Sequence, residues 1–201
     1  MRLRLASTLL LAATAAFGSQ AAVAAPVKNI VLVHGAFVGG SGWRPVYDIL
    51  THDGYHVTLV QEPLTSFTDD VAATKRILAM QNGPAILVGH SYGGAIITEA
   101  GNEPHVAGLV YIAAHALDNG ETEAINGKKF PNSAHPFVKK PDGLLYIHPA
   151  NFPEDFAAGL PLKHAQFQAE AQILTAAGVL TAHIPDQPGQ LTTSRYLAAK
   201  S

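Results

Sequence analysis

Short apolar runs alternate with segments of helical periodicity through the first half of the chain, and this alternation restricts the fold more than any other feature. The apolar runs cover residues 29–33, 55–60, 85–88 and 106–113. Continuous apolar runs of this length are typical of strands that are buried on both faces. Helices are predicted between them, over residues 42–51, 66–80 and 92–101. Strands that alternate with helices predict an α/β fold, with a parallel sheet, right-handed crossovers and helices on both faces.

The alternation breaks after residue 114. Residues 115–164 are rich in proline, glycine and turn dipeptides such as Asn119-Gly120, which indicates an inserted cap rather than a continuation of the sheet. A helix is predicted over 165–177, and a strand is predicted to begin near Tyr196. The chain therefore divides into a core at 25–114, a cap at 115–164, and a segment at 165–201 that holds a helix and an incomplete C-terminal part of the core.

The segment 1–24 has the composition of a secretory signal peptide. Arg2 and Arg4 precede an apolar stretch at 5–17, and Ala22-Val23-Ala24 is a typical cleavage site. The alternative is a membrane anchor, but the apolar stretch is short for a bilayer and is followed by small residues. We therefore expect an exported protein, periplasmic or secreted, with no stable membrane span after cleavage.

Composition argues against several classes of partner and cofactor. The net charge is −2 and the acidic residues are scattered, which gives no reason to expect nucleic acid as a partner. The chain contains no cysteine, so thiolate nucleophiles and thiolate metal sites are excluded. His52 and His56 are separated by Asp53-Gly54, which breaks a helix, so they do not form a metal-binding pair on adjacent turns. We expect no metal and no cofactor.

The segment Gly89-His90-Ser91-Tyr92-Gly93-Gly94 directly follows the third apolar run. A G-x-S-x-G sequence at a sharp turn from a strand into a helix is typical of a nucleophile elbow, in which a strained turn exposes the serine hydroxyl. Glycines suit such a turn because a Cβ there would collide with the neighbouring strand or helix. Ser91 is therefore the candidate nucleophile.

The segment His34-Gly35-Ala36-Phe37 lies at the end of the first strand. The backbone N–H groups of Ala36 and Tyr92 would lie at the C-terminal ends of separate parallel strands, where sites form in open sheets. Two such donors can stabilise the negative charge that develops on a carbonyl oxygen during acyl transfer. The alternative interpretation is a pair of unrelated glycine-rich turns.

The acid and the base that would activate the nucleophile are less apparent. Asp118 follows the fourth strand and is a candidate acid, although a simple turn residue is the alternative. His183 is the candidate base among the late histidines. Glu62 is interpreted as a surface-loop residue. His34 is interpreted as a brace for its loop, and the His90 side chain as directed away from the nucleophile.

Over residues 28 to about 172 the chain resembles the α/β-hydrolase superfamily, in particular bacterial esterase-like members close to the plant methylesterase and hydroxynitrile-lyase branch. The matching segments are residues 30–37 with Gly42-Trp43, then 89–94, then 109–115. The resemblance implies a three-layer α/β-hydrolase sheet with a cap, with Ser91 as nucleophile and the Ala36 and Tyr92 N–H groups as oxyanion hole. It implies a serine hydrolase that cleaves a small-molecule carboxylic ester through an acyl-Ser91 intermediate.

The C-terminal part departs from this resemblance. Such relatives continue with two further strands that carry the acid and the histidine, whereas residues 196–201 look like the start of the first of these strands. We therefore expect a truncated member that lacks the last strands and has an unpaired apolar edge at the fourth strand, open to self-association. Two alternatives stay open, namely a catalytically silent protein that binds a small molecule and a non-functional truncated member.

Overall fold

The computed structural model describes residues 26–117, 120–129, 131, 133–184 and the backbone of 194–197. The predicted signal peptide and Asp118 lie outside the described residues. Within the described part, five parallel strands form one sheet in the order β2-β1-β3-β4-β8. The strands are β1 (Asn29–Val33), β2 (His56–Leu59), β3 (Ala85–His90), β4 (Val106–Ile112) and β8 (Ser194–Leu197).

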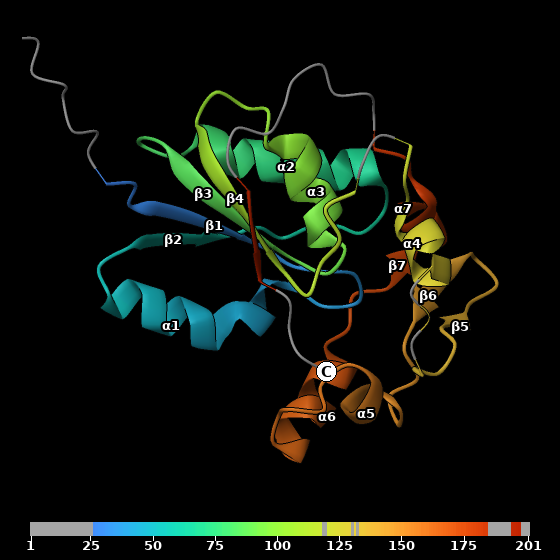
Figure 1. The fold of residues 1–201 in the computed structure, drawn as a ribbon. Coiled ribbons are helices and arrows are strands. Elements are labelled where there is room, and N and C mark those ends of the chain that lie inside the picture. The colour runs from blue at the N-terminus through green and yellow to red at the C-terminus, as the bar shows by residue number, and fades with distance from the viewer. Residues whose placement is uncertain (1–25, 118–119, 130, 132, 185–193, 198–201) are drawn as a thin grey trace, which may run out of the picture.

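Helices cover both faces of this sheet (Figure 1). They are the 3₁₀ helix η1 (Gly40–Trp43) and the α-helices α1 (Arg44–His52), α2 (Phe67–Ala79) and α3 (Gly93–Ala100). Helix α1 lies on one face, and α2 and α3 lie on the other (Figure 1). Helix α2 begins after Ser66, whose hydroxyl accepts the N–H of Asp69 at 3.1 Å and so caps the helix. The predicted α/β sheet with helices on both faces is confirmed.

Strand β1 is buried along its whole length and divides the apolar core into two clusters. Val31 and Val33 belong to the cluster that includes the buried residues of α2 and α3. Ile30 and Leu32 belong to the second cluster, together with Trp43 and partly buried residues of α1. Successive side chains of a strand point to opposite faces, so a continuous apolar run is what a strand between two helical layers requires.

The edge of the sheet differs from the prediction. Strand β8 pairs in parallel with β4, from Leu109 opposite Ser194 to Ile112 opposite Leu197. The prediction of an unpaired edge at the fourth strand is therefore wrong over these residues, because the backbone groups on that side of β4 bond to β8. Self-association through a sheet edge stays a prediction, and the strand at that edge in the described part of the chain is β8.

The segment between β4 and β8 has secondary structure of its own, on one side of the sheet (Figure 1). Strands β5, β6 and β7 form a separate antiparallel sheet. The elements are α4 (Glu123–Lys129), β5 (Val138–Lys139), β6 (Leu144–Tyr146), α5 (Phe152–Asp155), α6 (Leu162–Glu170), β7 (Thr175–Ala176) and α7 (Ala177–Thr181). No helix among the described residues is long and apolar enough to cross a membrane.

The helix predicted over 165–177 is wrong at both ends, since α6 begins at Leu162 and ends at Glu170. Tertiary contacts interrupt the helical periodicity. The Gln172 side chain donates to the carbonyl of Ala169 at 2.9 Å and accepts the N–H of Ile147 at 3.0 Å. Thr175 then joins the small sheet, so the chain is extended where its sequence alone favours a helix.

Strand β7 also ties this segment to the loop that follows β1. The N–H of Phe37 donates to the hydroxyl of Thr175 at 3.0 Å, and the N–H of Ile173 donates to the carbonyl of Phe37 at 3.0 Å. Phe37 has a φ of 68°, a left-handed conformation that a non-glycine residue adopts only when its surroundings enforce it. These bonds fix the path of the chain just beyond Ala36.

Candidate active site

Ser91 lies at the turn between β3 and α3 with a φ of 53°. This left-handed conformation is uncommon for a residue with a Cβ and marks a strained turn. Its N–H bonds to the carbonyl of Ile112 at 3.3 Å, and its carbonyl accepts the N–H of Gly94 at 2.9 Å. The backbone of Ser91 is thus held between the neighbouring strand β4 and the first turn of α3.

Two glycines around Ser91 have no space for a side chain. A Cβ on Gly93 would lie 2.6 Å from the carbonyl oxygen of His34, at the end of β1. A Cβ on Gly89 would lie 2.5 Å from the carbonyl oxygen of Gly93. Both obstacles are backbone atoms, which cannot rotate away as a flexible side chain can. The close approach of β1, β3 and α3 therefore depends on these glycines.

The loop after β1 reaches the turn that carries Ser91. A Cβ on Gly35 would lie 2.9 Å from the Cβ of Ser91 and 3.1 Å from the carbonyl oxygen of His90. Ala36 and Tyr92, the two residues whose N–H groups form the predicted oxyanion hole, are both buried. The tertiary structure therefore brings together the two backbone segments that the sequence analysis singled out.

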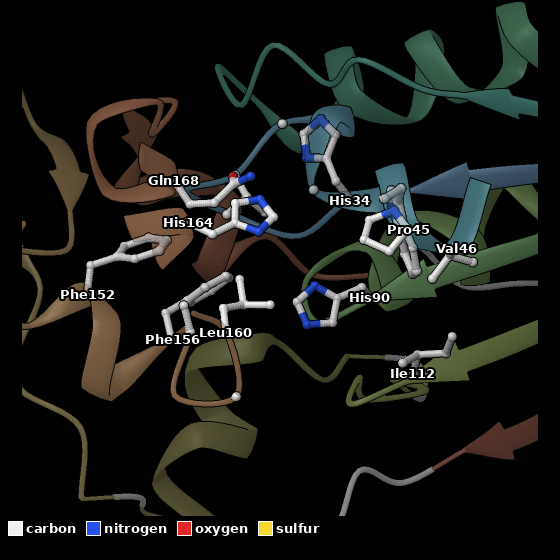
Figure 2. Close-up of a pocket in the computed structure, with 16 residues that line it drawn as sticks. His34, Pro45, Val46, His90, Ile112, Phe152, Phe156, Leu160, His164 and Gln168 are labelled. Carbon is white, nitrogen blue, oxygen red and sulfur yellow. The ribbon is translucent and has the colours of Figure 1, made fainter. Parts of the chain in front are cut away.

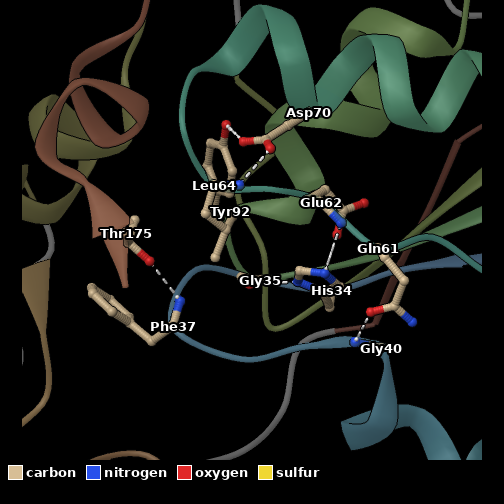
Figure 3. A network of polar contacts seen from close by, with 10 residues as sticks. All are labelled: His34, Gly35, Phe37, Gly40, Gln61, Glu62, Leu64, Asp70, Tyr92 and Thr175. Carbon is tan, nitrogen blue, oxygen red and sulfur yellow. Dashed lines mark hydrogen bonds and ion pairs between the residues drawn. The ribbon is translucent and has the colours of Figure 1, made fainter. Parts of the chain in front are cut away.

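His34 and Glu62 form a buried pair beneath this loop (Figure 3). The Nε2 of His34 lies 2.6 Å from the Oε2 of Glu62, and its Nδ1 lies 2.9 Å from the carbonyl oxygen of Gly35. Burial lowers the pKa of His34, but the hydrogen bond and the charge of Glu62 outweigh it, so the pKa is raised. The interpretation of Glu62 as a surface residue is wrong, since it is only 2% exposed. A carboxylate in the loop after a strand was the available signal, and such carboxylates are equally common on the surface.

Asp70 is a second buried carboxylate close to the turn (Figure 3). It accepts the hydroxyl of Tyr92 at 2.8 Å and the N–H of Leu64 at 2.8 Å. Burial raises the pKa of Asp70 to about 6, although these two hydrogen bonds act in the opposite direction. Burial also raises the pKa of the Tyr92 phenol. The sequence offered no sign of this role, because an acid in the first turn of a helix is explained by the helix dipole alone.

The raised pKa of Asp70 predicts a pH-dependent stability. Between the ordinary value of 3.8 and about 6, the folded protein holds a proton that the unfolded chain has lost. This contribution to the free energy of unfolding is fully present below the lower value and is lost as pH rises through the upper one. From pH 4 to pH 7, the wild type should lose about 2 kcal/mol relative to Asp70→Asn. Urea unfolding of both proteins across this range measures the difference, and a difference independent of pH would contradict the prediction.

His90 lies in the wall of a pocket (Figure 2), where its ring contacts those of Trp43 and Phe156. Both contacts are edge-on, with ring centroids 6.2 Å and 6.0 Å apart. Burial lowers the pKa of His90, and the charge of His34 lowers it further. A neutral, packed imidazole is suited to shaping the pocket.

This pocket has a volume of about 420 Å³ and lies between the sheet and the segment that carries α5 and α6 (Figure 2). Its walls are mainly apolar, and Ser91 is not among the residues that line it. On the sheet side it is lined by Trp43, Pro45, Val46, His90 and Ile112. On the other side it is lined by Phe152, Phe156, Leu160, His164 and Gln168.

Of the predicted acid and base, Asp118 lies outside the described residues and His183 lies within them. His183 is exposed, and its Nδ1 lies 2.9 Å from the carbonyl oxygen of Gly120. No hydrogen bond joins His183 to Ser91 among the described residues. A different pair, which the sequence analysis missed, consists of His115 and the partly buried Glu123, with 2.8 Å between Nδ1 and Oε2. Burial raises the pKa of Glu123 in spite of His115.

His115 lies in the loop after β4, which ends at Ile112, and its backbone approaches the first turn of α3. A Cβ on Gly94 would lie 2.7 Å from the carbonyl oxygen of His115. The signal for this pair in the sequence is weak, because His115 lies in the loop after β4 and Glu123 begins α4, so no periodicity within a single element relates them. Elsewhere in the described part of the chain, no three histidine or acidic side chains gather in a way that could hold a metal ion.

Residues 30–199, which include the parallel sheet and the turn at Ser91, match the model of the alpha/beta hydrolase family. The chain therefore belongs to the α/β-hydrolase family. It is 33% identical over 110 residues to a carbendazim hydrolyzing esterase of Nocardioides sp. (strain SG-4G), which covers 48% of this chain and 46% of that protein. It is 34% identical over 131 residues to a pyrethroid hydrolase of Sphingobium wenxiniae, which covers 55% of this chain and 44% of that protein.

The chain thus spans a little under half the length of these curated relatives. Among solved structures, it is similar to the crystal structure of polyneuridine aldehyde esterase, with a TM-score of 0.66 and 17% sequence identity. That match covers 80% of this chain and 75% of the esterase. At this identity the likeness supports the fold alone. The names of the two curated relatives are those of an esterase and a hydrolase.

Proposed function

We propose that the protein is a serine hydrolase that cleaves a small carboxylic ester through an acyl-Ser91 intermediate. The observation that carries this proposal is the left-handed turn at Ser91, packed against Gly35 of the loop after β1. A strained turn of this kind exposes a hydroxyl at the C-terminal edge of a parallel sheet. The esterase homologues support the same class of reaction.

The proposed reaction has two halves. The Ser91 oxygen bonds to the ester carbonyl carbon while its proton passes to a base, and the carbonyl oxygen becomes an oxyanion. The N–H groups of Ala36 and Tyr92 donate to that oxygen. The carbon–oxygen bond to the alcohol then breaks, and the alcohol takes the proton. Water, activated by the same base, attacks the acyl group and releases the acid and free Ser91.

The acid and the base are proposed from a short set of residues. Asp118 and His183 stay the first pair, on the sequence argument. His115 joins them because Glu123 orients its ring through a hydrogen bond, which is the arrangement that a general base needs. Substituting each histidine by glutamine in turn identifies which of them supports turnover.

The mainly apolar pocket beside His90 supports a substrate with an apolar acyl or alcohol group. The two curated homologues are named for carbendazim and pyrethroid hydrolysis, which is compatible with such a group. No cofactor is proposed, because acyl transfer by serine requires none.

A fluorophosphonate probe tests the role of Ser91. The serine oxygen bonds to phosphorus and fluoride leaves, so labelling requires an activated hydroxyl. We expect a single adduct on Ser91 by peptide mass spectrometry, and none in Ser91→Ala. Ser41→Ala is the matched control, because Ser41 is exposed in η1 and its loss should leave labelling unchanged. An unlabelled wild type would contradict the proposal.

The alternative is a silent protein that binds a small apolar molecule, and the absence of Ser91 from the pocket lining favours it. Trp43, the one tryptophan of the chain, lines the pocket, so its fluorescence reports on occupancy. Saturable quenching by a naphthyl ester analogue without any labelling of Ser91 would favour this alternative over the hydrolase.

We also propose that the protein is exported and cleaved after Ala24. The basic, apolar and small-residue segments of 1–24 support this proposal. Expression of the full chain in a Gram-negative host should give a periplasmic product that begins at Ala25, as measured by N-terminal sequencing. Ala24→Asp, which puts a charge at the cleavage position, should prevent processing. A cytoplasmic product that keeps residues 1–24 would contradict export.

A further inference from the structure

Asp70 is a fully buried carboxylate that takes no direct part in the proposed reaction. Burying an ionisable carboxylate is costly unless its oxygens are bonded. Both oxygens of Asp70 are bonded, one to the hydroxyl of Tyr92 and one to the N–H of Leu64, each at 2.8 Å.

The Tyr92 side chain is held at both ends. Its hydroxyl donates to Asp70, and its ring packs edge-on against the ring of Phe67, with 6.5 Å between the ring centroids. The whole residue is only 1% exposed. Its backbone forms the start of α3, directly after the strained residue Ser91. Tyr92 is therefore anchored to the first turn of α2 at its hydroxyl, while its N–H is the proposed oxyanion donor.

Leu64 extends the same anchor to the loop after β2. Leu64 has a φ of 56°, so its left-handed backbone needs support from its surroundings. The bond from its N–H to Asp70 supplies this support, and its carbonyl accepts the N–H of Ala176 at 2.9 Å. Asp70 thus links α2, the loop after β2 and the turn at Ser91 (Figure 3).

We propose that Asp70 is a positioning residue, which holds the Tyr92 side chain and thereby keeps the Tyr92 N–H aimed at the oxyanion. The argument rests on the proposed function, because it assumes that an oxyanion forms beside Ser91. A hydrogen bond that stabilises a transition state is effective only when the donor is already oriented. A long side chain bonded at its far end restricts rotation of the backbone to which it is attached, and Tyr92 directly follows the strained residue Ser91.

A matched pair of tyrosines tests the proposal. Tyr92→Phe removes the hydroxyl that Asp70 binds. Tyr111→Phe removes an equally buried hydroxyl, which lies 3.0 Å from the hydroxyl of Thr98 in α3 rather than against Asp70. Both variants lose one buried hydrogen bond, so both should lose similar stability. Ester hydrolysis should separate them, with kcat about tenfold lower in Tyr92→Phe, KM unchanged, and kcat within about twofold of wild type in Tyr111→Phe. Equal effects on kcat would overturn the proposal.

A second measurement does not depend on turnover. In Asp70→Ala, whose side chain can bond neither Tyr92 nor Leu64, the ¹⁵N–¹H signal of the Tyr92 amide should shift or broaden, while that of Ala36, on the opposite side of the oxyanion hole, should stay in place. An unchanged Tyr92 amide would overturn the proposal. A wild type without any hydrolysis or labelling would count against Ser91 as nucleophile, and the amide signals would still decide whether Asp70 controls the Tyr92 backbone.

Discussion

Ser91→Ala is expected to reduce the hydrolysis of a p-nitrophenyl ester by about 10⁶-fold in kcat if a complete set of catalytic groups acts on Ser91. The reason is that the acyl-enzyme route disappears with the hydroxyl. Only the oxyanion donors and substrate binding remain, which accelerate the reaction about 10³- to 10⁴-fold over water. The measurement is the initial rate of p-nitrophenol release by the purified protein.

The size of the wild-type rate carries as much information as the loss. A wild type that hydrolyses the ester no faster than Ser91→Ala would show that no base in the chain activates the serine. In that case the turn at Ser91 has only a structural role, and binding of a small apolar molecule in the pocket is the function that remains. Ser41→Ala again serves as the control for non-specific effects of removing a serine.

Gly93→Ala is expected to destabilise the fold by about 3 kcal/mol or more, because overpacking against a backbone atom cannot be relieved by a rotamer change. The added Cβ would lie 2.6 Å from the carbonyl oxygen of His34 and 2.8 Å from that of Val33. Considered as a helical position alone, alanine would be favoured over glycine by about 1 kcal/mol. The expected loss therefore has the opposite sign to the intrinsic helix propensity. Urea unfolding followed by circular dichroism measures it.

Gly127→Ala is the matched control. Gly127 lies in helix α4, and a Cβ there meets nothing within 4 Å. This variant should be as stable as the wild type or gain about 0.5 to 1 kcal/mol from helix propensity. Equal effects of the two substitutions would show that β1 and α3 do not pack as closely as the structure has them.

The parallel strands of the main sheet and the place of the turn were predictable because both depend on local signals. Residues 29–33 are apolar without interruption and are buried as β1, and the glycines around Ser91 lie where close packing excludes a side chain. Each of these signals is contained in a few neighbouring residues. The ends of α6 were not predictable, because the Gln172 side chain and the pairing of Thr175 override the helical periodicity there.

The burial of the two acids at the site was likewise not predictable from the sequence. Glu62 and Asp70 resemble ordinary surface acids in the sequence, since nothing near them in the chain signals burial. Their partners His34 and Tyr92 are 28 and 22 positions away. The sequence by itself determined the parallel α/β layout, the turn at Ser91 and the loop at Ala36, because these follow from periodicity and glycine spacing. Only the tertiary structure decided that β8 covers the edge of β4 and that Asp70 anchors Tyr92, because such pairings depend on which distant segments meet in space.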